Sequence, residues 1–149
     1  MSAHSTLPTR LAAFFFMVLA AVLGLATRKT GLNAVPVIGT YGGDVAWAMA
    51  AYALVRMCAP KARIDTVMLI AGIMALGVEL SQLIDAQWIN DLRQNAFVAL
   101  IIGKGFLWSD LGAYIVGVLI AALINLIILR IAHARSASAH GLSSQKPAA

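Results

Sequence analysis

Four long apolar stretches, separated by short polar segments, dominate the pattern of this chain. They are Leu11–Thr27, Gly43–Cys58, Ile64–Ile84 and Asp110–Ile131. A helix needs roughly 20 mostly apolar residues to cross the hydrocarbon core of a bilayer. The second stretch is short and stops before Pro60, which disfavours helix at the residue that precedes it. The pattern predicts four transmembrane helices.

The segments between these stretches are more polar. Lys29–Gly42 contains Gly, Pro and Asn and is expected to be a loop. Ala86–Trp108 is too mixed to cross a membrane, but Trp88, Leu92, Ala96 and Ala99 recur at helical spacing. It is expected to form a short interfacial helix that ends at the turn of residues 103–105, with a re-entrant segment as the alternative. A single transmembrane domain then covers residues 1–131, and residues 132–149 form a small, polar tail that we expect to be disordered and cytoplasmic.

Composition supports the membrane assignment and an all-α fold. Of the 149 residues, 61% are hydrophobic and 11% charged, whereas soluble domains are about 25% charged. The first stretch resembles a signal peptide, but it exceeds the usual apolar length of about 7–15 residues, and we expect it to be retained. The one cysteine, Cys58, allows no disulfide within the chain.

The net charge of +5 is better explained by the sorting of basic residues to one membrane side than by a nucleic-acid partner. With the N-terminus inside, the inner segments hold Arg10, Arg56, Lys61, Arg63, Arg130, Arg135 and Lys146, and the outer segments hold Arg28, Lys29, Arg93 and Lys104. Basic residues favour the cytoplasmic side. We therefore predict a multi-pass inner-membrane protein with both termini in the cytoplasm.

Acidic residues sort to the opposite, outer side. Asp44 begins the second stretch, Glu79 lies five residues before the end of the third, and Asp110 opens the fourth. A charge in hydrocarbon costs at least about 2.5 kcal/mol, so these side chains should face each other or water. Gln82 shares a helix face with Glu79. Asp85 and Asp91 are expected to form a solvated rim.

Helical spacing extends the predicted site to other residues. Tyr114 lies one turn after Asp110 on a stripe that continues through Gly117 to Asn125. Three carboxylates this close would require a bound proton or a cation. Arg93 is the preferred cation and Lys104 the second choice, because a guanidinium can form two parallel hydrogen bonds with a carboxylate or phosphate. Small residues four apart, such as Ala20 and Gly24, Ala46 and Ala50, Ala71 and Ala75, and Ala113 and Gly117, would allow close helix contact.

These motifs resemble a family of small, uncharacterised bacterial membrane proteins of unknown function that is grouped with VanZ-like proteins. The resemblance covers about Leu11–Ala132 and rests on Gly43-Asp44, Glu79-x-x-Gln82 and Asp110-x-x-x-Tyr114-x-x-Gly117. VanZ-like proteins share the Glu-x-x-Gln, but they have asparagine where this chain has Tyr114. The resemblance implies an envelope role, with a link to tolerance of the glycopeptide teicoplanin.

Asp44, Glu79, Gln82, Arg93, Asp110 and Tyr114 are therefore the candidate residues for binding a ligand or a proton. The leading hypothesis is a non-enzymatic protein that binds a lipid-linked envelope ligand at the outer face. The alternative function is a proton- or ion-coupled carrier that works as a homo-oligomer. The structural alternative is that these residues form a hydrogen-bond network that only joins the helices. A lipid-phosphate enzyme is disfavoured because no histidine or serine nucleophile lies near the site.

Other residues are expected to have structural roles. Arg56 is expected to extend to the cytoplasmic interface. His4, His133 and His140 lack the spacing of metal ligands, so neither a metal nor another cofactor is expected.

Overall fold

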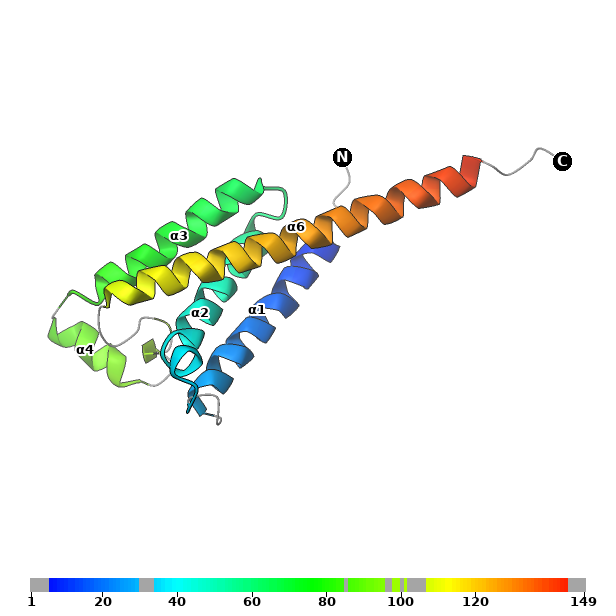
Figure 1. Ribbon diagram of the computed structural model, residues 1–149. Coiled ribbons are helices and arrows are strands. Elements are labelled where there is room, and N and C mark those ends of the chain that lie inside the picture. The colour runs from blue at the N-terminus through cyan, green and yellow to red at the C-terminus, as the bar shows by residue number, and fades with distance from the viewer. Residues whose placement is uncertain are drawn as a thin grey trace.

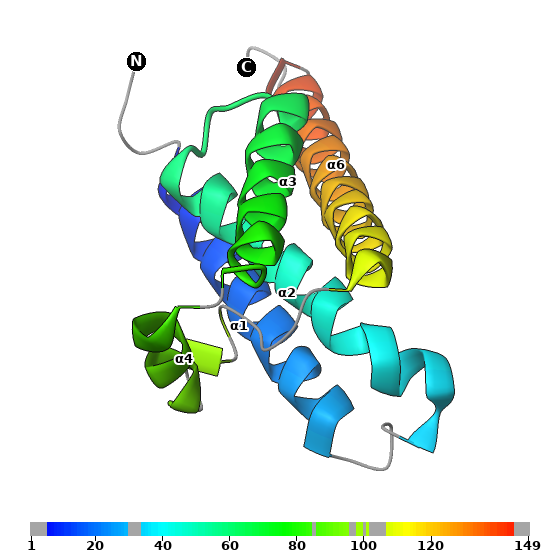
Figure 2. The same cartoon turned by 90° about the vertical axis from the view of Figure 1, so that its left-hand side faces the viewer.

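The computed structural model describes residues 6–29, 34–84, 86–95, 98, 99, 101 and 107–144. This part of the chain is all-helical and forms five helices without strands. Four of them make an elongated bundle and the fifth, α4, lies across one end of it (Figures 1 and 2). The predicted all-α fold is therefore present.

The first two helices pack against each other as an antiparallel pair. Helix α1 spans Leu7–Lys29 and α2 spans Pro36–Cys58. Residues 36–42 were expected to be loop, and this was wrong. Pro36 stands in the first turn of α2, where its fixed φ angle suits a helix and its missing N–H costs nothing.

The remaining helices also depart from the expected boundaries. Helix α3 spans Ile64–Ser81, the short α4 spans Gln87–Gln94, and α6 spans Trp108–Ser144. The tail from residue 132 was expected to be disordered, but residues 132–144 continue α6, which projects past the other helices (Figure 1). Its Ala and Arg residues favour helix. The turn at residues 103–105 lies outside the described residues.

Helix α2 forms the centre of the bundle, because it packs on α1, α3 and α6. Small residues allow these contacts. A Cβ atom on Gly117 of α6 would lie 2.8 Å from the Ala48 Cβ and would collide with the Val45 carbonyl oxygen, and one on Gly24 of α1 would lie 3.1 Å from the Ala46 Cβ. Since neither position has room for a larger side chain, the predicted small-residue contacts at Gly24 and Gly117 are present.

Three helices are long and apolar enough to cross a membrane: Leu7–Arg28, Ile64–Ser81 and Trp108–Ala132. Large apolar side chains cover their outer surfaces, as at Phe15, Ile73 and Ile115, which are each at least 60% exposed. Soluble proteins rarely expose such extensive apolar surfaces. Helix α2 is outside this set of three, and its central position explains why it tolerates more polar residues.

Candidate functional site

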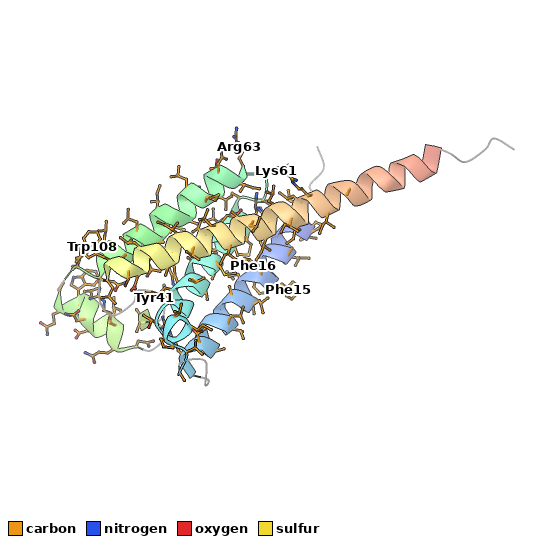
Figure 3. The ribbon with its side chains drawn as sticks, viewed as in Figure 1. Phe15, Phe16, Tyr41, Lys61, Arg63 and Trp108 are labelled. Atoms are coloured by element: carbon orange, nitrogen blue, oxygen red, sulfur yellow. The ribbon has the colours of Figure 1, made fainter. Side chains whose placement is uncertain are left out.

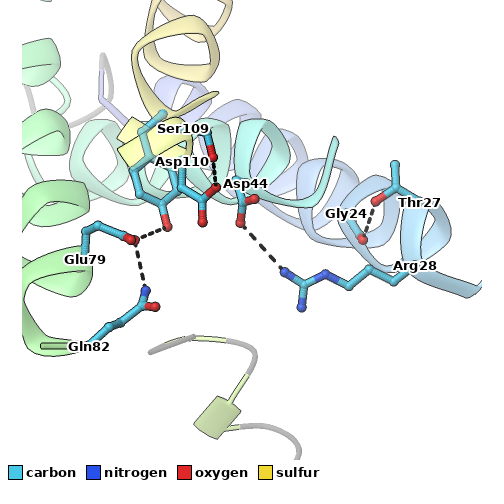
Figure 4. A network of polar contacts seen from close by, with 9 residues as sticks. Gly24, Thr27, Arg28, Asp44, Glu79, Gln82, Ser109 and Asp110 are labelled. Atoms are coloured by element: carbon cyan, nitrogen blue, oxygen red, sulfur yellow. Dashed lines mark hydrogen bonds and ion pairs between the residues drawn. The ribbon is translucent and has the colours of Figure 1, made fainter. Parts of the chain in front are cut away.

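The acidic residues of three helices gather at one end of the bundle. This end contains the last turn of α1, the first half of α2, the end of α3 and the start of α6. Figure 4 shows Asp44, Glu79 and Asp110 facing a common region. Lys61 and Arg63 lie at the start of α3, whereas Trp108 lies near the other end of this helix (Figure 3).

Glu79 is the most deeply buried of these acids, with 0% of its surface exposed. Its Oε2 atom accepts hydrogen bonds from the Tyr114 hydroxyl at 3.0 Å and from the Gln82 amide at 2.9 Å. Its Oε1 atom accepts a third from the Leu107 backbone N–H at 2.9 Å. The carboxylate therefore ties the end of α3 to the start of α6, and it is well compensated for a buried acid.

Tyr114 extends this contact to α2. Its side chain is 7% exposed, and its ring lies against the Trp47 ring with centroids 5.7 Å apart. The hydroxyl is thus held in place by packing on one side and by Glu79 on the other. Glu79 and Tyr114 are therefore held in fixed positions within the acidic cluster.

Asp44 is more accessible, with its side chain 20% exposed. Arg28 of α1 lies beside it, with the Arg28 Nη2 atom 3.9 Å from the Asp44 Oδ1 atom. The Arg28 side chain crosses Gly43, because a Cβ atom there would lie only 2.8 Å from the Arg28 Nε atom. Gly43 thus provides the space that brings this cation to the acid.

Asp110 completes the acidic group. Its Oδ1 atom accepts a hydrogen bond from the Ser109 hydroxyl at 3.2 Å. Its side chain lies near that of Asp44 (Figure 4). The pair of Asp44 and Asp110 is the part of the cluster that a ligand could reach, since Glu79 is fully enclosed.

Arg93 was the cation expected beside the carboxylates, but the structure places it elsewhere. Its Nη2 atom donates to the Ser81 carbonyl at 2.9 Å, and its Nη1 atom donates to the carbonyl of Ile84 at 3.4 Å and to the side chain of Asn90 at 3.0 Å. It therefore holds α4 against the end of α3, where the carbonyls lack helical partners. Arg28 takes the expected place instead. Asp85 and Lys104 lie outside the described residues.

A second polar cluster lies toward the other end of the bundle. Arg56 is 6% exposed, so its side chain is enclosed by the protein. Its Nη1 atom donates to the Ala62 carbonyl at 2.7 Å. The amide oxygen of Asn125 accepts from the Arg56 Nε atom at 3.2 Å and from the Tyr52 hydroxyl at 2.9 Å. The stripe that ends at Asn125 was visible in the sequence, but it did not specify this contact.

Within the described ranges, no group of three or more His, Cys, Asp or Glu side chains is arranged to hold a metal ion.

Comparisons with known proteins support an uncharacterised family and give no support for the VanZ-like grouping. No solved structure matches this chain. A family model described as a protein of unknown function, DUF2809, matches residues 34–118. The match contains α2, α3 and α4 and the start of α6, and with them Asp44, Glu79, Gln82, Asp110 and Tyr114. Because it covers more than half of the chain, this protein belongs to the DUF2809 family.

Proposed function

We propose that the protein is a four-span protein of the bacterial inner membrane, with α2 as the fourth span and both termini in the cytoplasm. The charge distribution supports this topology. Exposed Lys61 and Arg63 lie toward one end of the bundle and the acidic cluster lies at the other. Exposed Arg10 is near the start of α1, at the opposite end of that helix from Arg28. Basic residues mark the cytoplasmic side. Helix α4, with Trp88 63% exposed, then lies at the outer interface, where tryptophan is favoured.

The proposed function is the binding of an envelope ligand through a cationic group at the outer face. One observation carries it: Asp44 and Asp110 face a common region beside the enclosed Glu79 (Figure 4), while the cation Arg28 is 3.9 Å from Asp44 and its side chain is 47% exposed. Such an exposed ion pair contributes at most about 1 kcal/mol. A ligand amine could therefore displace the guanidinium and form charge-assisted hydrogen bonds with both aspartates.

The ligand is proposed to be lipid-linked. Apolar side chains lie near the site, as at Leu80 on α3 and Leu107 just before α6, which are 49% and 56% exposed, so a ligand would reach it from the membrane surface. The VanZ-like resemblance of Glu79-x-x-Gln82 is a further reason to test tolerance of glycopeptides. Catalysis is not part of the proposal.

The test uses phosphatidylethanolamine, an amine-bearing lipid, as the probe. We expect it to raise the unfolding temperature of the purified protein in detergent, and phosphatidylcholine, whose quaternary ammonium cannot donate hydrogen bonds, to have a smaller effect. Asp44→Asn and Asp110→Asn should each abolish the difference. Asp65→Asn is the matched control, because Asp65 is an exposed acid at the opposite end of α3, paired with Arg63 at 3.0 Å. Equal stabilisation of all variants would reject the proposal.

A proton-coupled carrier is the second candidate, and the enclosure of Glu79 favours it. A fully buried carboxylate within a candidate membrane span is often part of a proton path. In liposomes with an imposed pH gradient, the wild type would dissipate the gradient and Glu79→Gln would not. Four spans provide little room for an internal path, so this function would require a homo-oligomer. An intact gradient with the wild type would exclude proton conduction.

A further inference from the structure

A cavity of about 290 Å³ lies between α1, α2 and α6, away from the acidic cluster. Its walls are mostly apolar and include Ala12, Ala13, Phe16, Ala53, Ile124 and Ile128. The lining also contains four polar residues: Thr9, Tyr52, Arg56 and Asn125. Some lining residues are exposed, among them Pro8 and Ile128, so the cavity reaches the outer surface of the bundle.

Arg56 places a buried positive charge in this wall. The acceptors around its guanidinium are the carbonyls of Pro60 and Ala62 and the amide oxygen of Asn125, all of them neutral. Among the described residues, ion pairs join Arg28 to Asp44 and Arg63 to Asp65, and Arg56 takes part in none. A buried guanidinium is usually paired with an anion. The charge of Arg56 is therefore balanced only by neutral dipoles.

A purely structural role for Arg56 explains part of this arrangement. It stands in the last turn of α2, where the helix dipole favours a cation, and its bonds to the carbonyls of Pro60 and Ala62 brace the turn into α3. This role explains the hydrogen bonds that the Nη1 atom donates. It does not explain why the guanidinium also lines an apolar cavity that reaches the surface.

We propose that this cavity binds an anionic phospholipid, with part of one acyl chain between α1 and α6 and the phosphate beside Arg56. The volume is at the small end of ligand pockets, about 300–1,000 Å³, which suits part of a chain. A chain already in the bilayer gains little from entering an apolar cavity, since lipid tails and the wall are equally apolar. Selectivity for an anionic phospholipid must then come from the attraction between its phosphate and the charge of Arg56. Basic pockets between transmembrane helices recognise anionic headgroups in this way.

The surroundings favour an anion at this end of the bundle. Arg10 follows the lining residue Thr9 by one position and is exposed, as is Lys61 beside the turn braced by Arg56. The acid Asp65 in this region is already paired with Arg63. An approaching phosphate would therefore meet mainly positive charge.

The test measures lipid binding to the purified full chain in neutral detergent, by native mass spectrometry and by the shift in unfolding temperature. Phosphatidylglycerol should bind and stabilise the wild type, whereas phosphatidylcholine and inorganic phosphate should not. Ala12→Phe should weaken phosphatidylglycerol binding about tenfold or more by filling the cavity from an exposed position. Ala21→Phe, on an exposed part of α1 that does not line the cavity, is the matched control and should bind like the wild type.

Charge variants separate the site from general surface attraction. Arg56→Gln should lose the preference for phosphatidylglycerol over phosphatidylcholine, whereas Arg63→Gln, at an exposed basic residue of the same end, should keep it. Arg56→Gln could also disturb the turn into α3. Ala12→Phe leaves Arg56 unchanged and therefore tests the cavity independently. Equal loss with Arg63→Gln, unchanged binding with Ala12→Phe, or equal stabilisation by inorganic phosphate alone would each overturn the lipid site.

Discussion

Removing the Glu79 carboxylate tests whether it is the acceptor that joins α3 to α6. In Glu79→Ala, the hydroxyl of Tyr114 loses its partner at 3.0 Å while its ring stays packed against Trp47. A buried donor without a partner costs about 1–3 kcal/mol. The Gln82 side chain and the Leu107 N–H are less enclosed and can turn to water. Hydrogen bonds between membrane helices average about 0.6 kcal/mol with a maximum near 1.7, so we expect a coupling of about 1–2 kcal/mol between Glu79 and Tyr114.

A double-mutant cycle isolates this coupling. Tyr114→Phe should lower the free energy of unfolding by about 1–2 kcal/mol in the wild type. In Glu79→Ala the same change should be neutral or stabilising, because it then removes a buried hydroxyl that already lacks its acceptor. Tyr52→Phe is the matched control, since Tyr52 is equally buried but bonds to Asn125. Its cost should agree within about 0.5 kcal/mol in both backgrounds.

The assay is denaturant unfolding of the purified variants in mixed micelles, followed by tryptophan fluorescence. Equal costs of Tyr114→Phe in the presence and absence of Glu79 would refute the hydrogen bond as a structural link. A Tyr52→Phe cost that also vanished in Glu79→Ala would indicate that this substitution disturbs the whole bundle, and the coupling would then have to be measured with Glu79→Gln.

Three further predictions concern packing and charge. Gly117→Ala should destabilise the protein by about 1–3 kcal/mol in the same unfolding assay, because its Cβ atom would force α2 and α6 apart. The control Gly112→Ala has open space around its Cβ position and should be neutral or stabilising by up to about 1 kcal/mol. Equal effects of the two substitutions would contradict the close crossing of α2 and α6. Arg28→Gln should change stability by less than about 1 kcal/mol, since its ion pair with Asp44 is partly exposed, and a larger loss would show that the guanidinium is a structural part of the cluster. Arg93→Ala should increase proteolysis within α4 without changing the unfolding of the bundle, and unchanged cleavage would contradict its role in holding α4.

Local spacing in the sequence was sufficient to predict part of the acidic cluster. Glu79 and Gln82 are three residues apart on one helix, and their side chains are in hydrogen-bond contact. The stripe from Asp110 through Tyr114 to Gly117 faces the bundle because helical periodicity fixes which residues share a face. These predictions needed only the geometry of one helix each.

Contacts between distant segments could not be predicted in the same way. Arg28 rather than Arg93 lies beside Asp44, because the rotation of α1 and the space above Gly43 decide which long side chain reaches the acid. The burial of Arg56 likewise depends on how α6 crosses α2, which neither helix specifies by itself. Spacing within a segment cannot provide this information.

The helix ends were the least predictable part of the fold. Pro36 is compatible with a loop, but proline is equally suited to the first turn of a helix, and only the neighbouring helices determine which applies. The end of α6 was placed at Ile131 because the apolar pattern stops there. Small and basic residues can continue a helix beyond the apolar pattern, and here they do so to Ser144.

Cross-linking between Asp44 and Asp110 tests most directly whether acids from separate helices converge on the outer side of the membrane. Both positions would be changed to cysteine in a chain carrying Cys58→Ser, and intact cells would be treated with a short, membrane-impermeant bifunctional thiol reagent. Mass spectrometry of the peptides should then show α2 linked to α6 through the two introduced cysteines. No link, or a link that forms only after the membrane has been opened, would contradict an outward-facing acidic cluster.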